Sequence, residues 1–224
     1  MSDKSSNSVE NVISEKCFLL NDQVAFAHFS GDTNPIHVDK IAARRTLNGQ
    51  CIVHGMHCLL WALDSLAKEN RITGSKIRVR FLKPIFLGEA VYCVWNEQNK
   101  RLQILTNEIT FATIDLELGE ITPNNEIRTP IAAPRNVPRE FTFFECSKLS
   151  NQPFKIFGDI NLANRLFPSF SDLYGIATAC EIGAISQIVG MECPGLHSLF
   201  AALTVEITRK NTTPVFGVSK SYER

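Results

Sequence analysis

The chain has 224 residues, of which 44% are hydrophobic and 21% are charged, and its formal net charge is zero. This composition is typical of a globular protein, and the length suits one large domain or two of about 100 residues. The neutral charge, without clustered basic and aromatic residues, gives no reason to expect a nucleic-acid partner. No apolar run reaches the roughly 18 residues that a membrane-spanning helix needs, so we expect no membrane association.

Residues 1–14 are rich in serine, asparagine and charged side chains, which predicts a disordered lead-in and not a signal peptide. The seven cysteines are an odd number without a Cys-x-x-Cys pair, and they lie in apolar stretches. Unpaired cysteine behaves as a small hydrophobic residue, so we expect reduced thiols in the core. This pattern indicates a cytoplasmic protein.

In the first half of the chain, residues 15–120, an apolar pattern with three- and four-residue spacing at 54–68 predicts a long buried helix. Two short helices precede it, and Asp39 is the expected N-cap of the second. Alternating and β-rich runs follow the long helix. The predicted elements are helices at about 22–29, 39–47 and 54–68, and strands at 76–82, 90–96 and 102–118.

Four prolines and the pair Asn124-Asn125 predict an extended linker at 121–139. The second half, residues 140–224, then repeats the order of the first half. Its predicted elements are a strand at 141–144, a loop at 151–168, a helix at 172–189, and strands at 199–208 and 215–222.

A long buried helix wrapped by a curved antiparallel sheet is the hot-dog arrangement, so the sequence predicts an α+β fold with two hot-dog units in tandem. The second unit has fewer predicted strands than the first, and the sequence stops inside one of them. We therefore expect either a shortened second unit or a partner chain that supplies the missing edge.

The loop at 30–37 is the segment most informative about function. Gly31 allows a sharp bend before Asp32, and Asn34-Pro35 favours a turn that brings Asp32 and His37 together. A carboxylate and an imidazole that meet in this way can act as a general acid–base pair.

Gly55 stands at the beginning of the long helix predicted at 54–68. A helix N-terminus offers free N–H groups at the favourable end of the dipole, and glycine lets a substrate oxygen approach the backbone closely. One preorganised donor of this kind contributes about 3–4 kcal/mol where negative charge develops. Together with the acid–base pair, Gly55 points to the addition or removal of water at an activated acyl chain.

The segment 26–66 resembles the MaoC-like family of (R)-specific enoyl-thioester hydratases and (3R)-hydroxyacyl dehydratases. The matching residues are Ser30-Gly31-Asp32-x-Asn34-Pro35-Ile36-His37, then Ala42, Ala43 and Thr46, and then Ile52-Val53-His54-Gly55-Met56. The second half resembles the degenerate repeat of the double-hot-dog members.

The resemblance implies that Asp32 and His37 are the catalytic pair. They would activate one water for syn addition across the C2=C3 bond of a trans-2-enoyl thioester, or catalyse the reverse dehydration. The N–H of Gly55 would bind the thioester oxygen. The implied substrate contacts come from Ser30, Asn34, Val53, His54 and Met56.

The resemblance also implies that the protein needs no metal and no cofactor, because the substrate itself carries CoA or phosphopantetheine. The implied partner is an acyl-CoA or acyl carrier protein thioester. A homodimer is a further expected assembly.

Simpler explanations compete with some of these assignments. Asp32 could form only an Asx turn, and His37 could be a structural loop histidine. His54-x-x-His57 has the spacing of two metal ligands on one helix face, although no carboxylate or cysteine completes a recognisable set. The basic side chains at 76, 78 and 80 share one strand face, which is either solvated or in contact with the phosphates of CoA or an acidic carrier protein.

The second half contains Gly158-Asp159-Ile160-Asn161, which echoes Gly31-Asp32-Thr33-Asn34, but Asn164 stands where His37 would be. This echo is either a decayed motif or a coincidence. We expect no acid–base pair in the second half and no catalytic role for His197. The expected role of the second half is to complete the acyl tunnel and to cover the helix at 54–68.

Leu63 stands where some family members carry a hydroxyl, which puts one polar contact of the pocket in doubt. Two alternative functions stay open. A hot-dog thioesterase would need a carboxylate from the helix, and Asp64 is the acidic residue at its middle. A non-catalytic acyl-thioester-binding or assembly subunit is the other alternative.

Overall fold

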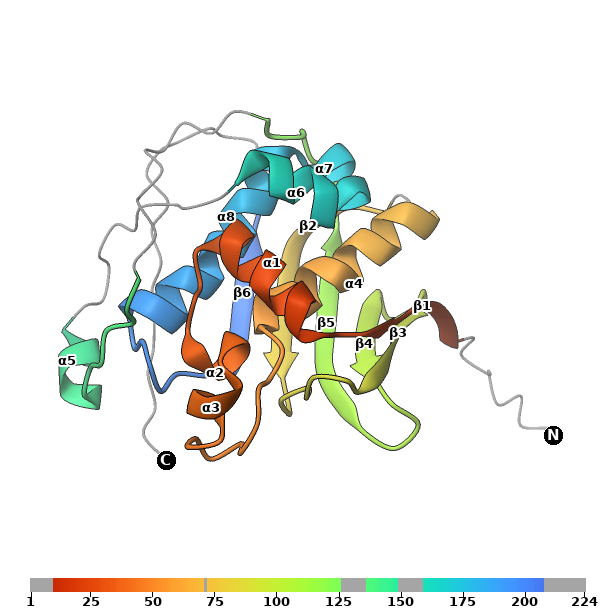
Figure 1. Cartoon of the computed structure of the whole chain (residues 1–224). Coiled ribbons are helices and arrows are strands. Elements are labelled where there is room, and N and C mark those ends of the chain that lie inside the picture. The colour runs from red at the N-terminus through yellow and green to blue at the C-terminus, as the bar shows by residue number, and fades with distance from the viewer. Residues whose placement is uncertain (1–9, 71, 126–135, 149–158, 208–224) are drawn as a thin grey trace.

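Six strands form one antiparallel sheet in the computed structural model, which describes residues 10–70, 72–125, 136–148 and 159–207 (Figure 1). The order of the strands in the sheet is β1-β3-β4-β5-β2-β6. Their bounds are β1 Glu10–Cys17, β2 Gly74–Phe81, β3 Ala90–Asn96, β4 Arg101–Leu105, β5 Thr110–Leu118 and β6 Ala202–Glu206. The strands predicted at 76–82 and 90–96 are confirmed, whereas the one predicted at 102–118 is a hairpin of β4 and β5.

β1 corrects the expected lead-in at 1–14. The strand begins at Glu10 and pairs with β3 from the register Glu10 with Asn96 onward, so residues 10–14 belong to the sheet. Val12 and Ile13 lie within this strand, and ladder hydrogen bonds outweigh the polar composition of the segment. Residues 1–9 lie outside the described part of the chain.

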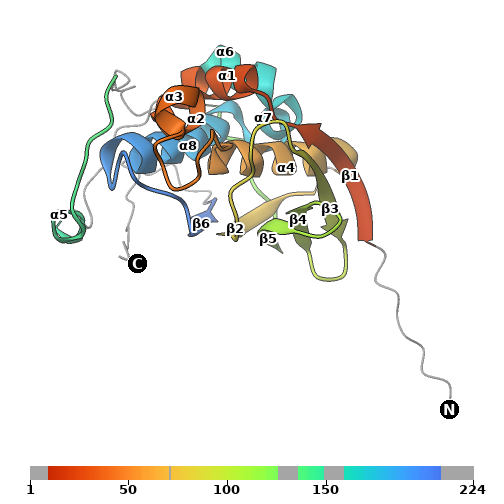
Figure 2. The same cartoon turned by 60° about the horizontal axis from the view of Figure 1, so that its bottom comes forward.

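Helix α4 (Gly55–Asn70) lies against the concave side of the sheet, and further helices pack on the side of α4 that faces away from the sheet (Figure 2). Its side chains Leu59, Leu63 and Leu66 are buried with Ile77 and Val79 of β2 in one core. The long buried helix predicted at 54–68 is confirmed. The fold is therefore α+β with a hot-dog-like first half, as predicted.

Three short helices lie between β1 and α4. They are α1 (Leu20–Ser30), α2 (Pro35–Val38) and α3 (Lys40–Ala43). α1 confirms the helix predicted at 22–29, and its last turn is closed by Gly31, which has a positive φ of 77°. The Asp39 carboxylate accepts from the N–H groups of Ile41 and Ala42, as expected of the N-cap of α3.

The second half differs from its predicted order. The strand predicted at 141–144 is wrong, because helix α5 (Phe143–Ser147) occupies this place. The cause is local: the Thr142 hydroxyl accepts from the Glu145 N–H, and the Glu145 carboxylate accepts from the Thr142 N–H, which is a capping box.

The loop predicted at 151–168 contains helix α6 (Ile160–Leu166), and residues 151–158 lie outside the described part. The single helix predicted at 172–189 is three consecutive pieces. They are α7 (Pro168–Tyr174), α8 (Ile176–Gln187) and a π-helical turn, η1 (Ile188–Glu192). Gly175, with a φ of 91°, separates α7 from α8, because that conformation cannot continue a right-handed helix.

The second half contributes strand β6 to the sheet of the first half. β6 pairs antiparallel with β2, from Lys76 opposite Glu206 to Arg80 opposite Ala202. It is a shorter form of the strand predicted at 199–208, and the strand predicted at 215–222 lies outside the described residues. On the sheet surface, Lys76 pairs with Glu206 and Arg78 pairs with Glu117, which fits a solvated strand face.

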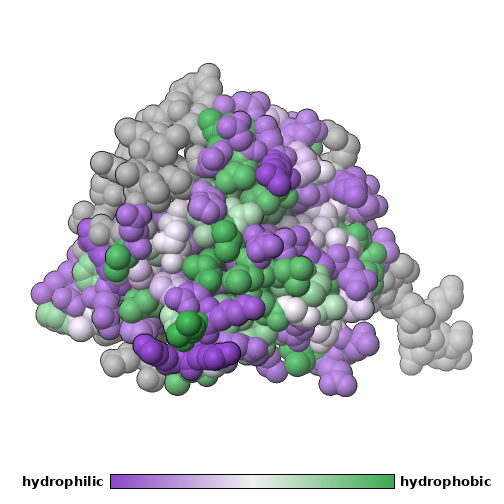
Figure 3. Space-filling view, viewed as in Figure 1, coloured by the Kyte–Doolittle hydropathy of each residue, from purple (hydrophilic) through white to green (hydrophobic). Residues whose placement is uncertain are grey.

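Within the described part of the chain, no single helix is long and apolar enough to cross a membrane, and α7 with α8–η1 meets the test only as a pair bent by 117°. Figure 3 shows hydrophobic residues between hydrophilic ones on the face that carries α1 and α3. Leu19, Ile41 and Leu47 are exposed.

All seven cysteines are unpaired, and Cys17 is exposed, contrary to the expectation that every thiol lies in the core.

Candidate functional site

The loop between α1 and α2 is built by hydrogen bonds among neighbouring residues. The Asp32 N–H donates to Ser30 Oγ at 3.2 Å, and Asp32 Oδ1 accepts from the Asn34 N–H at 3.1 Å. Asn34 is the N-cap of α2, because its Oδ1 accepts from the Ile36 N–H at 3.2 Å and Pro35 occupies the first helical position. Asp32 therefore does form an Asx turn, and its second carboxylate oxygen still faces the interior.

Asp32 and His37 come together as predicted. One oxygen of the Asp32 carboxylate, one ring nitrogen of His37 and one ring nitrogen of His54 all lie within 4.8 Å of one another. Asp32 is 1% exposed and His37 is 8% exposed. His37 Nδ1 lies 2.9 Å from Ile52 O. Since a carbonyl oxygen only accepts, Nδ1 carries the hydrogen, and Nε2 of the neutral ring has the free lone pair.

The pair is held in a dry environment that disfavours charge. Burial raises the pKa of Asp32, against the opposing effects of His37, the Ser186 hydroxyl and the Asn34 N–H. Burial likewise lowers the pKa of His37, against the opposing effects of Asp32 and Ile52 O. Each group therefore holds its neutral form more readily than it would in water.

His54 contacts both members of the pair. Its Nδ1 lies 2.9 Å from Gln23 Oε1, its Nε2 lies 3.1 Å from Asp32 O, and its ring stacks on that of His37 with centroids 3.8 Å apart. Burial lowers the pKa of His54 well below its usual value, so the ring is neutral and only one of its nitrogens carries a hydrogen. Because Gln23 Oε1 and Asp32 O both accept, the ring can donate to only one of them at a time. The predicted substrate contact is thus a support of the loop in this structure.

Gly55 follows His54 and begins α4. The His54 carbonyl accepts from the N–H groups of His57 and Cys58, whereas an N–H at the first helical position has no partner within the helix. A Cβ on Gly55 would lie 3.3 Å from Phe81 and 3.5 Å from Phe200, so two aromatic rings from β2 and the segment before β6 flank this backbone.

Two other predicted substrate contacts lie in the core. Val53 is buried and its N–H donates to Ile85 O at 2.9 Å, and Met56 is fully buried. Ser30 is also fully buried and supports the turn at Asp32. In this structure these residues are therefore part of the core or of the loop that carries Asp32.

The second half reaches directly into the site. The Ser186 hydroxyl donates to Asp32 Oδ2 at 2.7 Å, and Asn34 Nδ2 donates to Gly190 O at 3.0 Å and to Leu196 O at 3.2 Å. Sequence reasoning missed Ser186 and Gly190. The only available signal was the polar pair Ser186-Gln187 at the end of a long apolar run.

The same three side chains, Asp32, His37 and His54, are chemically able to ligate a metal ion. His54 would have to release Gln23 or the Asp32 carbonyl to do so. The expectation of no metal stays a prediction.

The remaining histidines have structural surroundings. The ring of His57 stacks on Phe26 with centroids 4.7 Å apart, and burial lowers its pKa well below the usual value. His28 is exposed on α1. His197 is exposed, and its Nε2 lies 3.2 Å from Glu140 Oε1.

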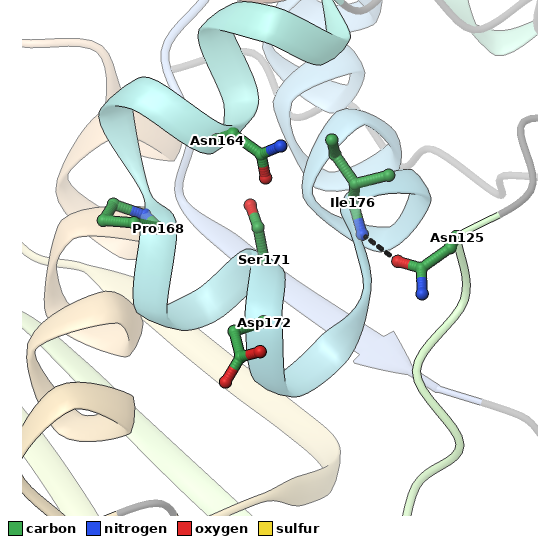
Figure 4. Close-up of a pocket in the computed structure, with 6 residues that line it drawn as sticks. All are labelled: Asn125, Asn164, Pro168, Ser171, Asp172 and Ile176. Carbon is green, nitrogen blue, oxygen red and sulfur yellow. Dashed lines mark hydrogen bonds between the residues drawn. The ribbon is translucent and has the colours of Figure 1, made fainter.

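In the second half, Asp159 works as a helix cap. Its carboxylate accepts from the N–H groups of Asn161 and Leu162 at the start of α6. Asn164 lines an open pocket of about 430 Å³, in which Asn125 Oδ1 accepts from the Ile176 N–H (Figure 4). The residues that line it are Asn125, Asn164, Pro168, Ser171, Asp172 and Ile176, so this pocket is separate from the Asp32 site.

Residues 7–115, about half of the chain, match the family model of the MaoC like domain. This segment contains β1 to β4, most of β5, α4 and the Asp32 loop, so the first half is a MaoC-like domain. The matched segment therefore belongs to the MaoC-like family, as the motifs at 30–37 and 52–56 predicted.

Three solved structures are similar to this chain. An (R)-hydratase from A. caviae involved in PHA biosynthesis is 25% identical over 52% of this chain and 100% of that one, with a TM-score of 0.37. An R-hydratase from Pseudomonas aeruginosa is 24% identical over 53% and 91%, with a TM-score of 0.36. A MaoC-like dehydratase from Phytophthora capsici is 12% identical over 88% and 80%, with a TM-score of 0.47.

All three TM-scores lie below 0.5, so the family assignment depends on the domain match alone. No curated protein matches the chain.

Proposed function

We propose that the protein is an (R)-type enoyl-thioester hydratase, or a (3R)-hydroxyacyl-thioester dehydratase when the reaction runs backwards. One observation carries the proposal: a carboxylate oxygen of Asp32 and a ring nitrogen of His37 lie within 4.8 Å of each other in a buried site. Two polar atoms at this separation can both form a hydrogen bond of ordinary length with one water. The MaoC-like domain supports a hydratase type of chemistry in general.

The protonation state of the pair suits this reaction. Burial raises the pKa of Asp32 and lowers that of His37, so the pair tends to hold a single proton between them. A pair with one proton always offers one acid and one base. The hydrogen on His37 Nδ1 is held by Ile52 O, which leaves Nε2 for proton transfer.

In the hydration direction, an O–H bond of water breaks as its oxygen bonds to C3, and the proton moves to the base of the pair. The π electrons of C2=C3 move onto the thioester, whose oxygen accepts from the Gly55 N–H. C2 takes a proton from the acid of the pair. One proton then passes between Asp32 and His37 to restore the starting state.

The decisive experiment follows the loss of the near-ultraviolet enoyl-thioester absorbance with crotonyl-CoA and with crotonyl-loaded acyl carrier protein. We expect hydration by the wild type and a loss of about 10²–10⁴-fold in kcat/KM for Asp32→Asn and for His37→Ala. His28→Ala, an exposed histidine on α1, is the matched control and should keep full activity. Activity that survives both site substitutions would mean that the site is elsewhere.

One observation favours a second candidate function, non-catalytic binding of acyl thioesters. Asp32 is 1% exposed and η1 lies against its carboxylate, so little of the carboxylate is open to a substrate in this structure. Thioester binding without turnover on either substrate would support this function.

The thioesterase alternative is weaker, because Asp64 Oδ1 accepts from the Phe170 N–H at 2.8 Å and so serves the start of α7. Release of free thiol from either thioester would support the thioesterase alternative.

As further parts of the proposal, the substrate carries its own CoA or phosphopantetheine and the protein assembles as a homodimer. The unpaired cysteines favour a cytoplasmic location.

A further inference from the structure

We propose that Ser186, a residue of the second half, is a positioning residue that holds the Asp32 carboxylate in place. This inference rests on the proposed function, because it concerns the same acid–base pair. It makes the second half a working part of the site and not only a cover.

The contact is short, buried and remote in sequence. The Ser186 hydroxyl donates to Asp32 Oδ2 at 2.7 Å, and both residues are 1% exposed. A hydrogen bond between a hydroxyl and an ionised oxygen is stronger than a neutral one, and in a buried site its loss leaves that oxygen unsatisfied.

Ser186 completes the orientation of the carboxylate. Asp32 Oδ1 accepts from the Asn34 N–H at 3.1 Å, so each of the two oxygens is held by a different half of the chain. Two donors on opposite oxygens fix the rotation of the carboxylate plane. The remaining lone pairs are then presented in a fixed direction to the water that the pair would bind.

Gly190 makes this contact geometrically possible. A Cβ at this position would lie 2.5 Å from Asp32 Oδ1 and 2.6 Å from Oδ2, so only glycine lets η1 lie against the carboxylate. Asn34 Nδ2 donates to Gly190 O and thereby holds η1 at this distance. Ser186 and Gly190 are four residues apart, and together they form one surface that faces Asp32.

The groups that face Asp32 include two titratable side chains, His37 on α2 and His54 before α4. From the second half, α8 and η1 contribute the Ser186 hydroxyl and the Gly190 backbone, which are uncharged. Removal of the hydroxyl therefore withdraws a donor without changing the charge of the site. The expected direction is a higher pKa of Asp32, because the bond to Ser186 acts to lower it.

The test compares Ser186→Ala, Ser186→Thr and Ser65→Ala in the full chain. Ser65 is the matched control, because it is a buried serine on α4 whose hydroxyl donates to Trp61 O of its own helix. Two readouts are used for each variant. One is the pH profile of kcat/KM with crotonyl-CoA, and the other is the titration of the Asp32 carboxyl carbon by NMR of protein labelled with ¹³C-aspartate, assigned with Asp32→Asn.

For Ser186→Ala we expect kcat/KM to fall about 10- to 100-fold, the loss that accompanies one hydrogen bond to a charged group. The limb of the pH profile that reports Asp32, and the NMR titration, should both move to higher pH. Ser186→Thr should restore both because it keeps the hydroxyl, and Ser65→Ala should match the wild type.

An unchanged NMR titration in Ser186→Ala would overturn the proposal, whatever happens to activity. A shifted titration with unchanged kcat/KM would also overturn it, because the contact would then do nothing for the reaction. If the wild type does not hydrate either thioester, the proposed function fails, and the NMR titration still decides whether Ser186 holds the carboxylate.

Discussion

The segments at 31–34 and 158–161 have related sequences, yet their aspartates have different roles. The Asp159 carboxylate accepts hydrogen bonds from two N–H groups at the start of α6, as an ordinary N-cap does. Asp32 is buried, accepts from the Asn34 N–H and the Ser186 hydroxyl, and faces His37. A Gly-Asp-x-Asn pattern thus does not by itself indicate chemistry, because the local helix start decides what the carboxylate is used for.

The position of the first helical residue explains the difference. Pro35 begins α2, so the capping role falls to Asn34, two residues after Asp32. In the second half, α6 begins at Ile160, directly after Asp159, and the aspartate itself becomes the cap. A shift of the helix start by a few residues leaves the first carboxylate available for a site and uses the second for folding.

The largest expected difference in stability between the two segments is at their asparagines. Asn34→Ala should lower the free energy of unfolding by about 2–4 kcal/mol, because it removes a buried cap and leaves the carbonyls of Gly190 and Leu196 unpartnered. Asn161→Ala, at an exposed position, should change it by less than about 0.5 kcal/mol. Urea unfolding of both variants measures this, and equal effects would contradict the assigned roles.

A second difference concerns how stability depends on pH. Burial raises the pKa of Asp32 in the folded protein, so the folded state binds this proton more tightly than the unfolded state does. The stability linked to Asp32 is therefore fully present below its unfolded pKa and is lost as the pH rises through the folded pKa. Asp32→Asn removes this loss, so the stability of the variant relative to the wild type should increase as the pH rises above about 4.

Asp39 provides the control of opposite sign for this measurement. It caps α3 as Asp159 caps α6, and the N–H groups of Ala42 and Ile41 lower its pKa. Its linked stability is present above the unfolded pKa and is lost as the pH falls through the folded pKa. Asp39→Asn should therefore lose stability relative to the wild type as the pH rises, and parallel slopes for the two variants would refute the sign given for Asp32.

The smallest expected effect is that of restoring the missing histidine in the second half. Asn164→His should give no hydration activity in an Asp32→Asn background, because Asp159 stays engaged as a cap. The exposed position predicts a change in stability within about 0.5 kcal/mol. Measurable turnover of crotonyl-CoA by this double variant would show that the second segment keeps a latent site.

The sequence predicted best what depends on neighbouring residues. The spacing of apolar residues identified α4, and the loop residues Asp32 and His37 could be paired because a turn alone brings them together. The strand at 141–144 was a wrong prediction, although Thr142 and Glu145 carry the signal of a capping box. Gly175 likewise marked the break between α7 and α8 within an apolar run that looked continuous.

What the sequence did not predict depends on contacts between distant segments. Ser186 meets Asp32 across 154 residues, and no periodicity or motif announces such a contact. His54 was predicted to contact substrate and instead supports the loop for the same reason, because its Nδ1 lies against Gln23 Oε1 of the distant helix α1. The placement of residues within one loop is a local property, whereas the polar partners of a buried carboxylate are set by the packing of the whole fold.

Strand β6 has a consequence for how the two halves can be separated. It occupies the outer side of β2, from Ile77 opposite Val205 to Val79 opposite Leu203. A fragment that stopped after β5 would leave the backbone of β2 as an open sheet edge, ready to pair with other chains. The same cut would remove the cover over Asp32, so the boundary of the family domain is not a boundary at which this molecule can be divided without exposing both its sheet and its site.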